Sequence, residues 1–173
     1  EEYRADLIWT EWVRQALHRD RLKLLAQPIV AAGHWRRDEP GGEALHYEIL
    51  ARLLDDQDRE IAPARFLPAI ARARMLEPFD RAVIERTLAR LGADSALRQA
   101  TRCCSINITG PTLCDVSFPP YLAELLARHA IDPSILSLEI TESDSITSID
   151  IALRNVDELK RMGVSIAVDD FGT

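Results

Sequence analysis

The sequence predicts an α/β fold in which a mostly parallel sheet curls into a barrel. Apolar strand segments alternate with amphipathic helical segments along the chain, which is typical of repeated βα units. In each of the later strands, large aliphatic residues occupy one face. The other face carries a small residue and, two positions later, a polar one. This pattern suits a barrel with helices outside and a functional mouth, whereas an open doubly wound sheet is apolar on both faces.

A helix and two strands open the chain. Residues 2–19 carry apolar side chains at helical spacing, and strands are predicted over 22–30 and 45–54. The loop between these strands contains Gly33 and the Pro40-Gly41-Gly42 run. Because a parallel crossover needs a dozen or more residues and usually a helix, we expect the two strands to be antiparallel.

Helices and further strands follow. One helix is predicted from Pro63 to Ala73, and a second from Phe79 to Leu91 with Gly92 as its C-terminal cap. Strands are then expected over 104–108, 136–141 and 164–169, separated by helices over 121–129 and 148–162. Gly163 should end the last of these helices.

The composition is that of a folded domain and excludes several classes of protein. The chain has 173 residues, of which 47% are hydrophobic and 28% charged. Its net charge of −7 argues against binding long nucleic acid through a basic surface. Cys103, Cys104 and Cys114 have no zinc-ligand spacing, so we expect buried thiols in a reducing compartment. No segment has the length of an apolar membrane span or the pattern of a signal peptide.

Oxygen-bearing side chains gather on the predicted inner face of the barrel. Glu48 belongs to the second strand, and Asn107, Glu139 and Asp169 lie at or near the ends of three later ones. The carboxyl ends of parallel strands meet at one mouth of a barrel. A single acid near a strand end is usually a cap or a solvated residue, but several buried together require a positive partner.

This oxygen set predicts a divalent-metal hydrolase site. All-oxygen ligation favours Mg²⁺, Mn²⁺ or Ca²⁺, and the lack of converging His or Cys argues against zinc and copper. The adjacent residues Asp169 and Asp170 could serve two ions. Two ions can activate a water and stabilise both oxygens in phosphodiester hydrolysis.

Five motifs, in order, resemble the EAL-domain family, the cyclic di-GMP phosphodiesterases of bacterial signalling. They are QPI from Gln27, EIL from Glu48 with Arg52, NIT from Asn107, EITES from Glu139 and DDFGT from Asp169. The resemblance implies a (β/α)₈ TIM-like barrel with an antiparallel first strand, truncated here after the fifth strand. It divides the chain into an amphipathic linker helix, 1–19, and a barrel domain, 20–173, that is incomplete at its C-terminus.

The resemblance also implies a role for each motif residue. One Mg²⁺ or Mn²⁺ ion would be bound by Glu48, Asn107, Glu139 and Asp169, and Asp170 would join Asp169 on a second ion. Ca²⁺ would act as an inhibitory ion. Glu142 would anchor the loop that begins at Phe171 and couple the metal site to dimer contacts. The catalytic set would be Glu48, Glu142, Asp169 and Asp170.

The substrate and partners follow from the same resemblance. Gln27, Leu50 and Arg52 would contact cyclic di-GMP, Arg52 through a charge-assisted hydrogen bond to phosphate. The product would be 5′-pGpG. The resemblance further implies a homodimer, an upstream signalling domain, and a cytoplasmic location, including as the cytoplasmic part of a membrane-attached protein.

Departures from the family pattern leave a second function open. Ile49 replaces the alanine of the family signature, but by strand alternation it points away from Glu48. A Lys, a Glu and a Gln of the family's later strands would lie beyond Thr173, so we expect a polypeptide ending there to be inactive. The alternative function is a catalytically inactive receptor for cyclic di-GMP. A purely structural domain would leave the inward acids unexplained.

Overall fold

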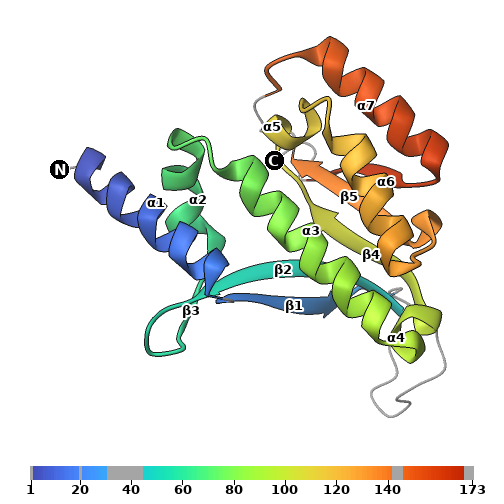
Figure 1. Ribbon diagram of the computed structural model, residues 1–173, viewed down its shortest axis with the longest axis horizontal. Helices are drawn as coiled ribbons and strands as arrows, with labels where there is room; N and C mark the ends of the chain where they lie inside the picture. Colours follow the sequence, from blue (N-terminus) through green and yellow to red (C-terminus); the bar gives the residue numbers. More distant parts are fainter. Residues whose placement is uncertain (1, 20, 31–44, 142–145, 170–173) are drawn as a thin grey trace.

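The computed structural model describes residues 2–19, 21–30, 45–141 and 146–169. The strands are β1 (Leu22–Pro28), β2 (Leu45–Leu54), β3 (Glu60–Ile61), β4 (Thr101–Asn107), β5 (Leu136–Thr141) and β6 (Ser165–Asp169). The helices are α1 (Glu2–His18), α2 (Pro63–Arg72), α3 (Leu76–Ala93), α4 (Ser95–Ala100), α5 (Gly110–Leu113), α6 (Phe118–His129), the 3₁₀ turn η1 (Pro133–Ile135) and α7 (Ile149–Met162). Figure 1 shows these elements in place.

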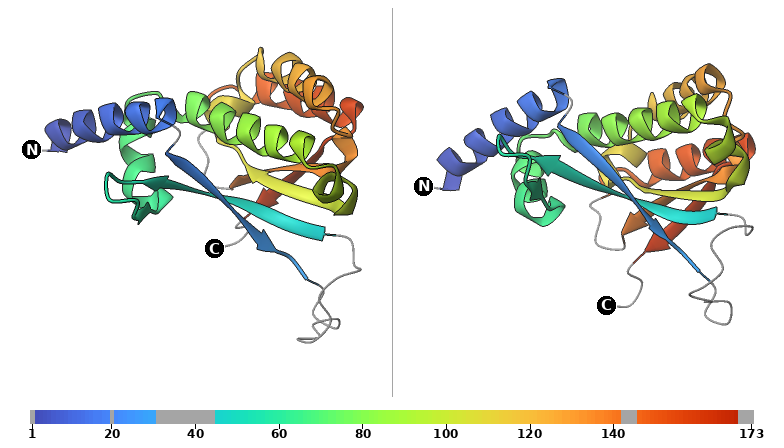
Figure 2. Two further views of the ribbon diagram at one scale, coloured as in Figure 1. Left: turned by 60° about the horizontal axis from the view of Figure 1, so that its bottom comes forward. Right: turned by 90° about the horizontal axis from the view of Figure 1, so that it is seen from below.

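The strands form one mostly parallel sheet. Its order is β1-β2-β4-β5-β6, and β3 pairs with β2. β1 runs antiparallel to β2, as predicted, whereas β2, β4, β5 and β6 are parallel to one another. In Figure 2 the sheet is strongly twisted and α3, α6 and α7 lie along one of its faces. The architecture is a partial α/β barrel with an antiparallel first strand, which confirms the predicted fold class.

The predicted alternation of side chains is present in the central strands. Ile106 and Leu138 are fully buried on the helix-covered face. Asn107 and Glu139 lie next to them in sequence and are only partly buried, on the opposite face. At the end of β6, Val168 belongs to the outer face by alternation, yet it is 60% exposed. None of the described helices covers it.

Two glycines were expected to end helices, and one of these predictions was wrong. Gly163 caps α7 in the left-handed conformation, with φ of 99°, as expected. Gly92 instead lies inside α3, which continues to Ala93. A Cβ at Gly92 would lie 2.9 Å from the Cβ of His129, so glycine allows α3 and α6 to approach closely. A contact between distant segments therefore explains Gly92.

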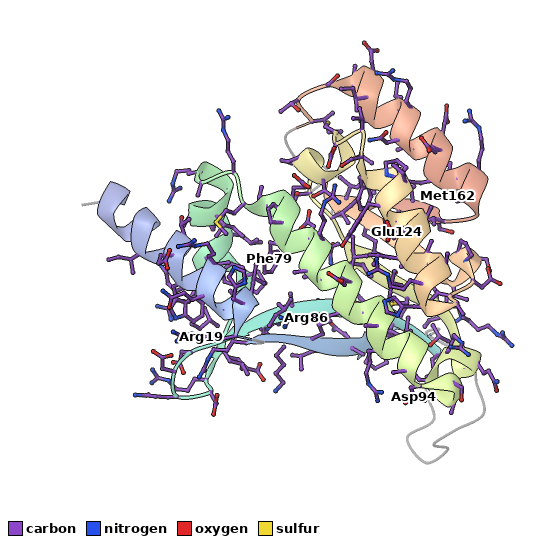
Figure 3. All side chains as sticks on the ribbon, viewed as in Figure 1. Arg19, Phe79, Arg86, Asp94, Glu124 and Met162 are labelled. Carbon is purple, nitrogen blue, oxygen red and sulfur yellow. The ribbon has the colours of Figure 1, made fainter. Side chains whose placement is uncertain are left out.

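The core lies between the sheet and its helices. Phe66 and Phe118 are completely buried, and Phe66 meets Phe79 edge to face with ring centroids 5.3 Å apart. Figure 3 labels Phe79 near the start of α3, beside α2. Val13 and Ala16 of α1 are buried in the same core. Within the described ranges, none of the helices has the length and apolarity that a membrane crossing requires.

Four short elements were not predicted: β3, α4, α5 and η1. Each is six residues long or shorter. Hydrophobic periodicity needs a window of about 11 residues or more to identify a helix, so segments of this length give no signal. One of them, α5, begins three residues after Asn107, the last residue of β4.

Candidate functional site

Strand register brings the predicted oxygen ligands to neighbouring positions on one face. In the sheet, Gln27 pairs with Glu48 across β1 and β2. Asn107 pairs with Glu139 across β4 and β5. The backbone of Asp169 pairs with that of Thr141, two residues beyond Glu139. Successive ligands therefore advance along tilted strands, as expected where they gather at one barrel mouth.

Glu48 and Asn107 are in direct contact. The side-chain amide of Asn107 donates from Nδ2 to Glu48 Oε1 at 2.6 Å, between residues 59 positions apart in sequence. Because this bond uses the amide nitrogen, Oδ1 is the atom of Asn107 that can bind a cation. Glu139, the register partner of Asn107, is likewise half-buried on this face. Carboxylate and amide oxygens in this arrangement fit a hard divalent ion.

The predicted substrate residues lie beside these acids. Gln27 is exposed on β1, directly opposite Glu48. Leu50 and Arg52 follow Glu48 at alternate positions of β2, so all three share one face of the sheet. The Arg52 guanidinium donates from Nη1 to the carbonyl oxygen of Ala51 at 2.8 Å. Arg52 is half-buried and held beside its own strand.

Part of the predicted site lies outside the described residues. Glu142 and Asp170 both fall outside them, and for Asp169 only the backbone is described. Within the described part, no three His, Cys, Asp or Glu side chains form a metal-binding group. The roles of these residues therefore stay predictions.

The three cysteines were expected to be buried thiols, but only Cys104 is buried, whereas Cys103 and Cys114 are partly buried. Cys103, Cys104 and Cys114 are all free thiols. Burial raises the pKa of the Cys104 thiol to about 12, so this group stays protonated at neutral pH. On the same outer face of the sheet, the Tyr47 hydroxyl is hydrogen-bonded to Thr101 Oγ1 at 3.0 Å. Cys104 and Tyr47 therefore lie on the side of the sheet away from the acids.

A cavity of about 440 Å³ also lies on this outer side. Leu24, Ala26, Tyr47 and Ile49 line it from β1 and β2, and Leu91 lines it from α3. Ile49 and Glu48 are adjacent in an extended strand and so point to opposite faces. The cavity is therefore separate from the oxygen-lined face.

Sequence reasoning missed a buried acid that lies close to the end of the strand carrying Asn107. Asp80 on α3 is only 4% exposed. It accepts hydrogen bonds from Thr109 and Thr112, just after the strand that carries Asn107. The helical pattern could have identified Asp80, because this residue precedes Val83 by three residues and Ile84 by four. At helical spacing this places a charge on the apolar face.

Comparisons with known proteins agree with these features. The family described as "EAL domain" matches residues 10–173. The chain is 34% identical over 161 residues to "Cyclic di-GMP phosphodiesterase PdeF" of Escherichia coli strain K12, covering 93% of this chain and 20% of that protein. The chain thus spans about one fifth of that relative.

Solved structures are similar over nearly the whole chain. "PaMucR Phosphodiesterase, c-di-GMP complex" matches with a TM-score of 0.80 and 28% identity, covering 95% of this chain and 64% of that one. "Crystal structure of FimX EAL domain from Pseudomonas aeruginosa bound to c-di-GMP" matches with a TM-score of 0.79 and 27% identity, covering 95% and 62%. These matches cover somewhat less than two thirds of the solved chains.

Proposed function

The chain belongs to the EAL domain family, and from that premise we propose that it is part of a cyclic di-GMP phosphodiesterase. The reaction is metal-dependent hydrolysis of cyclic di-GMP to 5′-pGpG. One observation carries the proposal: Asn107 and Glu48, far apart in sequence, meet at 2.6 Å on the face that also bears Glu139. A relative named as such a phosphodiesterase, 34% identical, supports the same activity.

In this proposal two Mg²⁺ or Mn²⁺ ions are held by Glu48, Asn107, Glu139, Asp169 and Asp170. When bound, such ions supply an activated water and stabilise the oxygens of the cleaved phosphodiester. The contact between Asn107 and Glu48 orients both side chains before any ion arrives, which reduces the cost of assembling the ligands. Ca²⁺ prefers more ligands and longer bonds than Mg²⁺, which supports its proposed role as an inhibitor.

Gln27, Leu50 and Arg52 are proposed to bind the dinucleotide. Their location on the same face as Glu48 supports this role. The Arg52 guanidinium would orient a phosphate by a charge-assisted hydrogen bond. Glu142 is proposed to anchor the loop that begins at Phe171 and to take part in coupling that loop to a dimer interface.

We propose a homodimer and an upstream signalling domain as partners. Ile149 and Leu153, one turn apart on α7, are 59% and 56% exposed, and such an apolar pair supports an interface between two copies. Residues 1–19 would link residues 20–173 to the upstream domain. A cytoplasmic location is proposed because the three cysteines are free.

The test is to incubate the full-length protein with cyclic di-GMP and separate the products by anion-exchange chromatography. We expect 5′-pGpG with Mn²⁺ or Mg²⁺, and none with Ca²⁺ or excess EDTA. Glu48→Gln should lower kcat by roughly 100-fold or more, since it replaces a metal ligand. Glu60→Gln is the matched control, because Glu60 forms an exposed ion pair with Lys23 at 2.7 Å. An unchanged rate in Glu48→Gln would contradict the assignment.

The alternative function is an inactive cyclic di-GMP receptor. This function is supported by the similarity to the FimX EAL domain, whose structure is of a complex with c-di-GMP. The same experiment separates the two functions. Unmodified cyclic di-GMP recovered bound to the protein in the presence of Mn²⁺ identifies a receptor, whereas conversion to 5′-pGpG identifies the enzyme.

A further inference from the structure

Asp80 forms an unusual cluster of hydrogen bonds for a buried carboxylate. Its Oδ2 accepts three hydrogen bonds: from the backbone N–H of Thr109 at 2.8 Å, the Thr109 hydroxyl at 2.7 Å and the Thr112 hydroxyl at 2.5 Å. Burying an ionised carboxylate is costly unless such bonds replace its water shell. Asp80 is 4% exposed, so these bonds must be well formed.

The partners of Asp80 define where β4 ends. β4 finishes at Asn107, and Ile108 still donates its N–H to the carbonyl oxygen of Glu139 at 2.9 Å. Thr109 comes next and is the N-cap of α5. The chain must leave the sheet at this residue and begin a helix. Asp80 binds both the N–H and the hydroxyl of Thr109 at this turn.

The other end of α5 is held by a different helix. Asn155 of α7 is 4% exposed and donates from Nδ2 to the carbonyl oxygens of Leu113 at 2.7 Å and Asp115 at 2.9 Å. α5 is only four residues long and has little stability of its own. Its geometry is therefore imposed from α3 on one side and from α7 on the other.

We infer that Asp80 is a positioning residue for the site: by fixing Thr109, it sets the end of β4 and with it the carboxamide of Asn107. This inference rests on the proposed function, in which Asn107 binds a metal ion. Asp80 acts on that ion only through the backbone of β4. Groups that orient a metal ligand change metal affinity by about 10- to 100-fold when removed.

The inference is tested in the full chain with Asp80→Ala and Asp80→Asn. Mn²⁺ affinity is measured by titration, and the position of the Asn107 side chain by NMR of its ¹⁵N-labelled amide. Asp80→Ala should weaken Mn²⁺ binding about tenfold and shift the Asn107 resonance. Asp80→Asn keeps an oxygen that can accept from the Thr109 N–H, so it should restore most of the affinity.

Thr87→Val is the matched control. Thr87 is a buried polar residue on the same helix, 3% exposed, and its hydroxyl donates to the Val83 carbonyl oxygen at 2.8 Å within α3. This variant should leave both the Mn²⁺ affinity and the Asn107 resonance unchanged. Thr109→Val removes one of the three bonds and should weaken Mn²⁺ binding by about threefold, which gives a readout if Asp80→Ala does not fold.

The possible outcomes separate this inference from the proposed function. If Asn107→Ala weakens Mn²⁺ binding but neither Asp80→Ala nor Thr109→Val does so, Asp80 has only a structural role and the inference fails. If Asn107→Ala does not weaken Mn²⁺ binding, the proposed metal site has failed, and the NMR measurement decides alone. An Asn107 resonance that moves in Asp80→Ala and not in Thr87→Val then supports positioning, and one that stays in place overturns it.

Discussion

Arg86 joins the N-terminal helix to the barrel through two hydrogen bonds, and its removal should destabilise the protein. It donates from Nη2 to the carbonyl oxygen of Leu17 at 3.0 Å and from Nη1 to that of Leu22 at 2.9 Å. Leu17 lies in the last turn of α1 and Leu22 begins β1. A cation at this helix end also interacts favourably with the helix dipole. Figure 3 labels Arg86 on α3, close to the end of α1.

Arg86→Met keeps an extended apolar side chain but removes both donors. A hydrogen bond from a charged donor contributes about 1.5–3 kcal/mol, so the loss of two partly buried bonds should cost about 3 kcal/mol. In a domain of this size, each kcal/mol lowers the melting temperature by roughly 2–4 °C, which gives a fall of roughly 6–12 °C. The two bonds hold the backbone at Leu17 and Leu22, so hydrogen exchange should accelerate at the end of α1 and the start of β1.

Arg90→Met is the matched control on the same helix. Arg90 is exposed and pairs at 3.2 Å with Asp94, the C-cap residue of α3. Such a surface pair contributes about 0.5 kcal/mol or less. Urea unfolding monitored by circular dichroism compares the two variants. The reasoning is refuted if Arg86→Met loses no more stability than Arg90→Met.

Two smaller predictions concern a carboxylate and a helix cap. Burial opposes ionisation of Asp115, but hydrogen bonds from Ser117 and Arg81 outweigh it and lower the pKa of Asp115 below its ordinary value of 3.8. This stabilisation is present above pH 3.8 and is lost as the pH falls through the folded-state pKa, so the urea-midpoint gap between wild type and Asp115→Asn should narrow from pH 7 to pH 2. Ala130 caps α6 with φ of 52°, and Ala130→Gly should raise the free energy of unfolding by about 1 kcal/mol; an unchanged or lower value would contradict this.

The inner face of the barrel could be predicted because it depends on local alternation. Side chains of a strand alternate between its two faces, so Asn107 must share a face with Ser105, and Glu139 must share one with Ser137. The observed register pairs Ser105 with Ser137 and Asn107 with Glu139, as that pattern requires. The alternation does not show which strands are neighbours in the sheet or in what register they pair. The contact between Asn107 and Glu48 could therefore be identified only from the three-dimensional structure.

Gly92 and Asp80 show that the contact partners of a residue could not be assigned from the sequence, even where its position stood out. A glycine near an expected helix end usually marks a cap, yet Gly92 is required because His129 packs against it. The sequence places Asp80 on an apolar helix face but does not show which groups its carboxylate binds. Its hydrogen-bond partner is Thr109, 29 residues later, and no local sequence rule links the two residues. Both features record a contact between distant segments.

Arg86 and Asp80 lie on the same helix and allow stability to be separated from site geometry. They are six residues apart on α3, about 9 Å along the helix axis, and they hold different segments. Sites at this separation without shared partners usually contribute additively. Arg86→Met should therefore lower the free energy of unfolding while leaving Mn²⁺ affinity intact, whereas Asp80→Ala should lower both. If both variants weakened Mn²⁺ binding equally, loss of stability alone would explain the effect of Asp80.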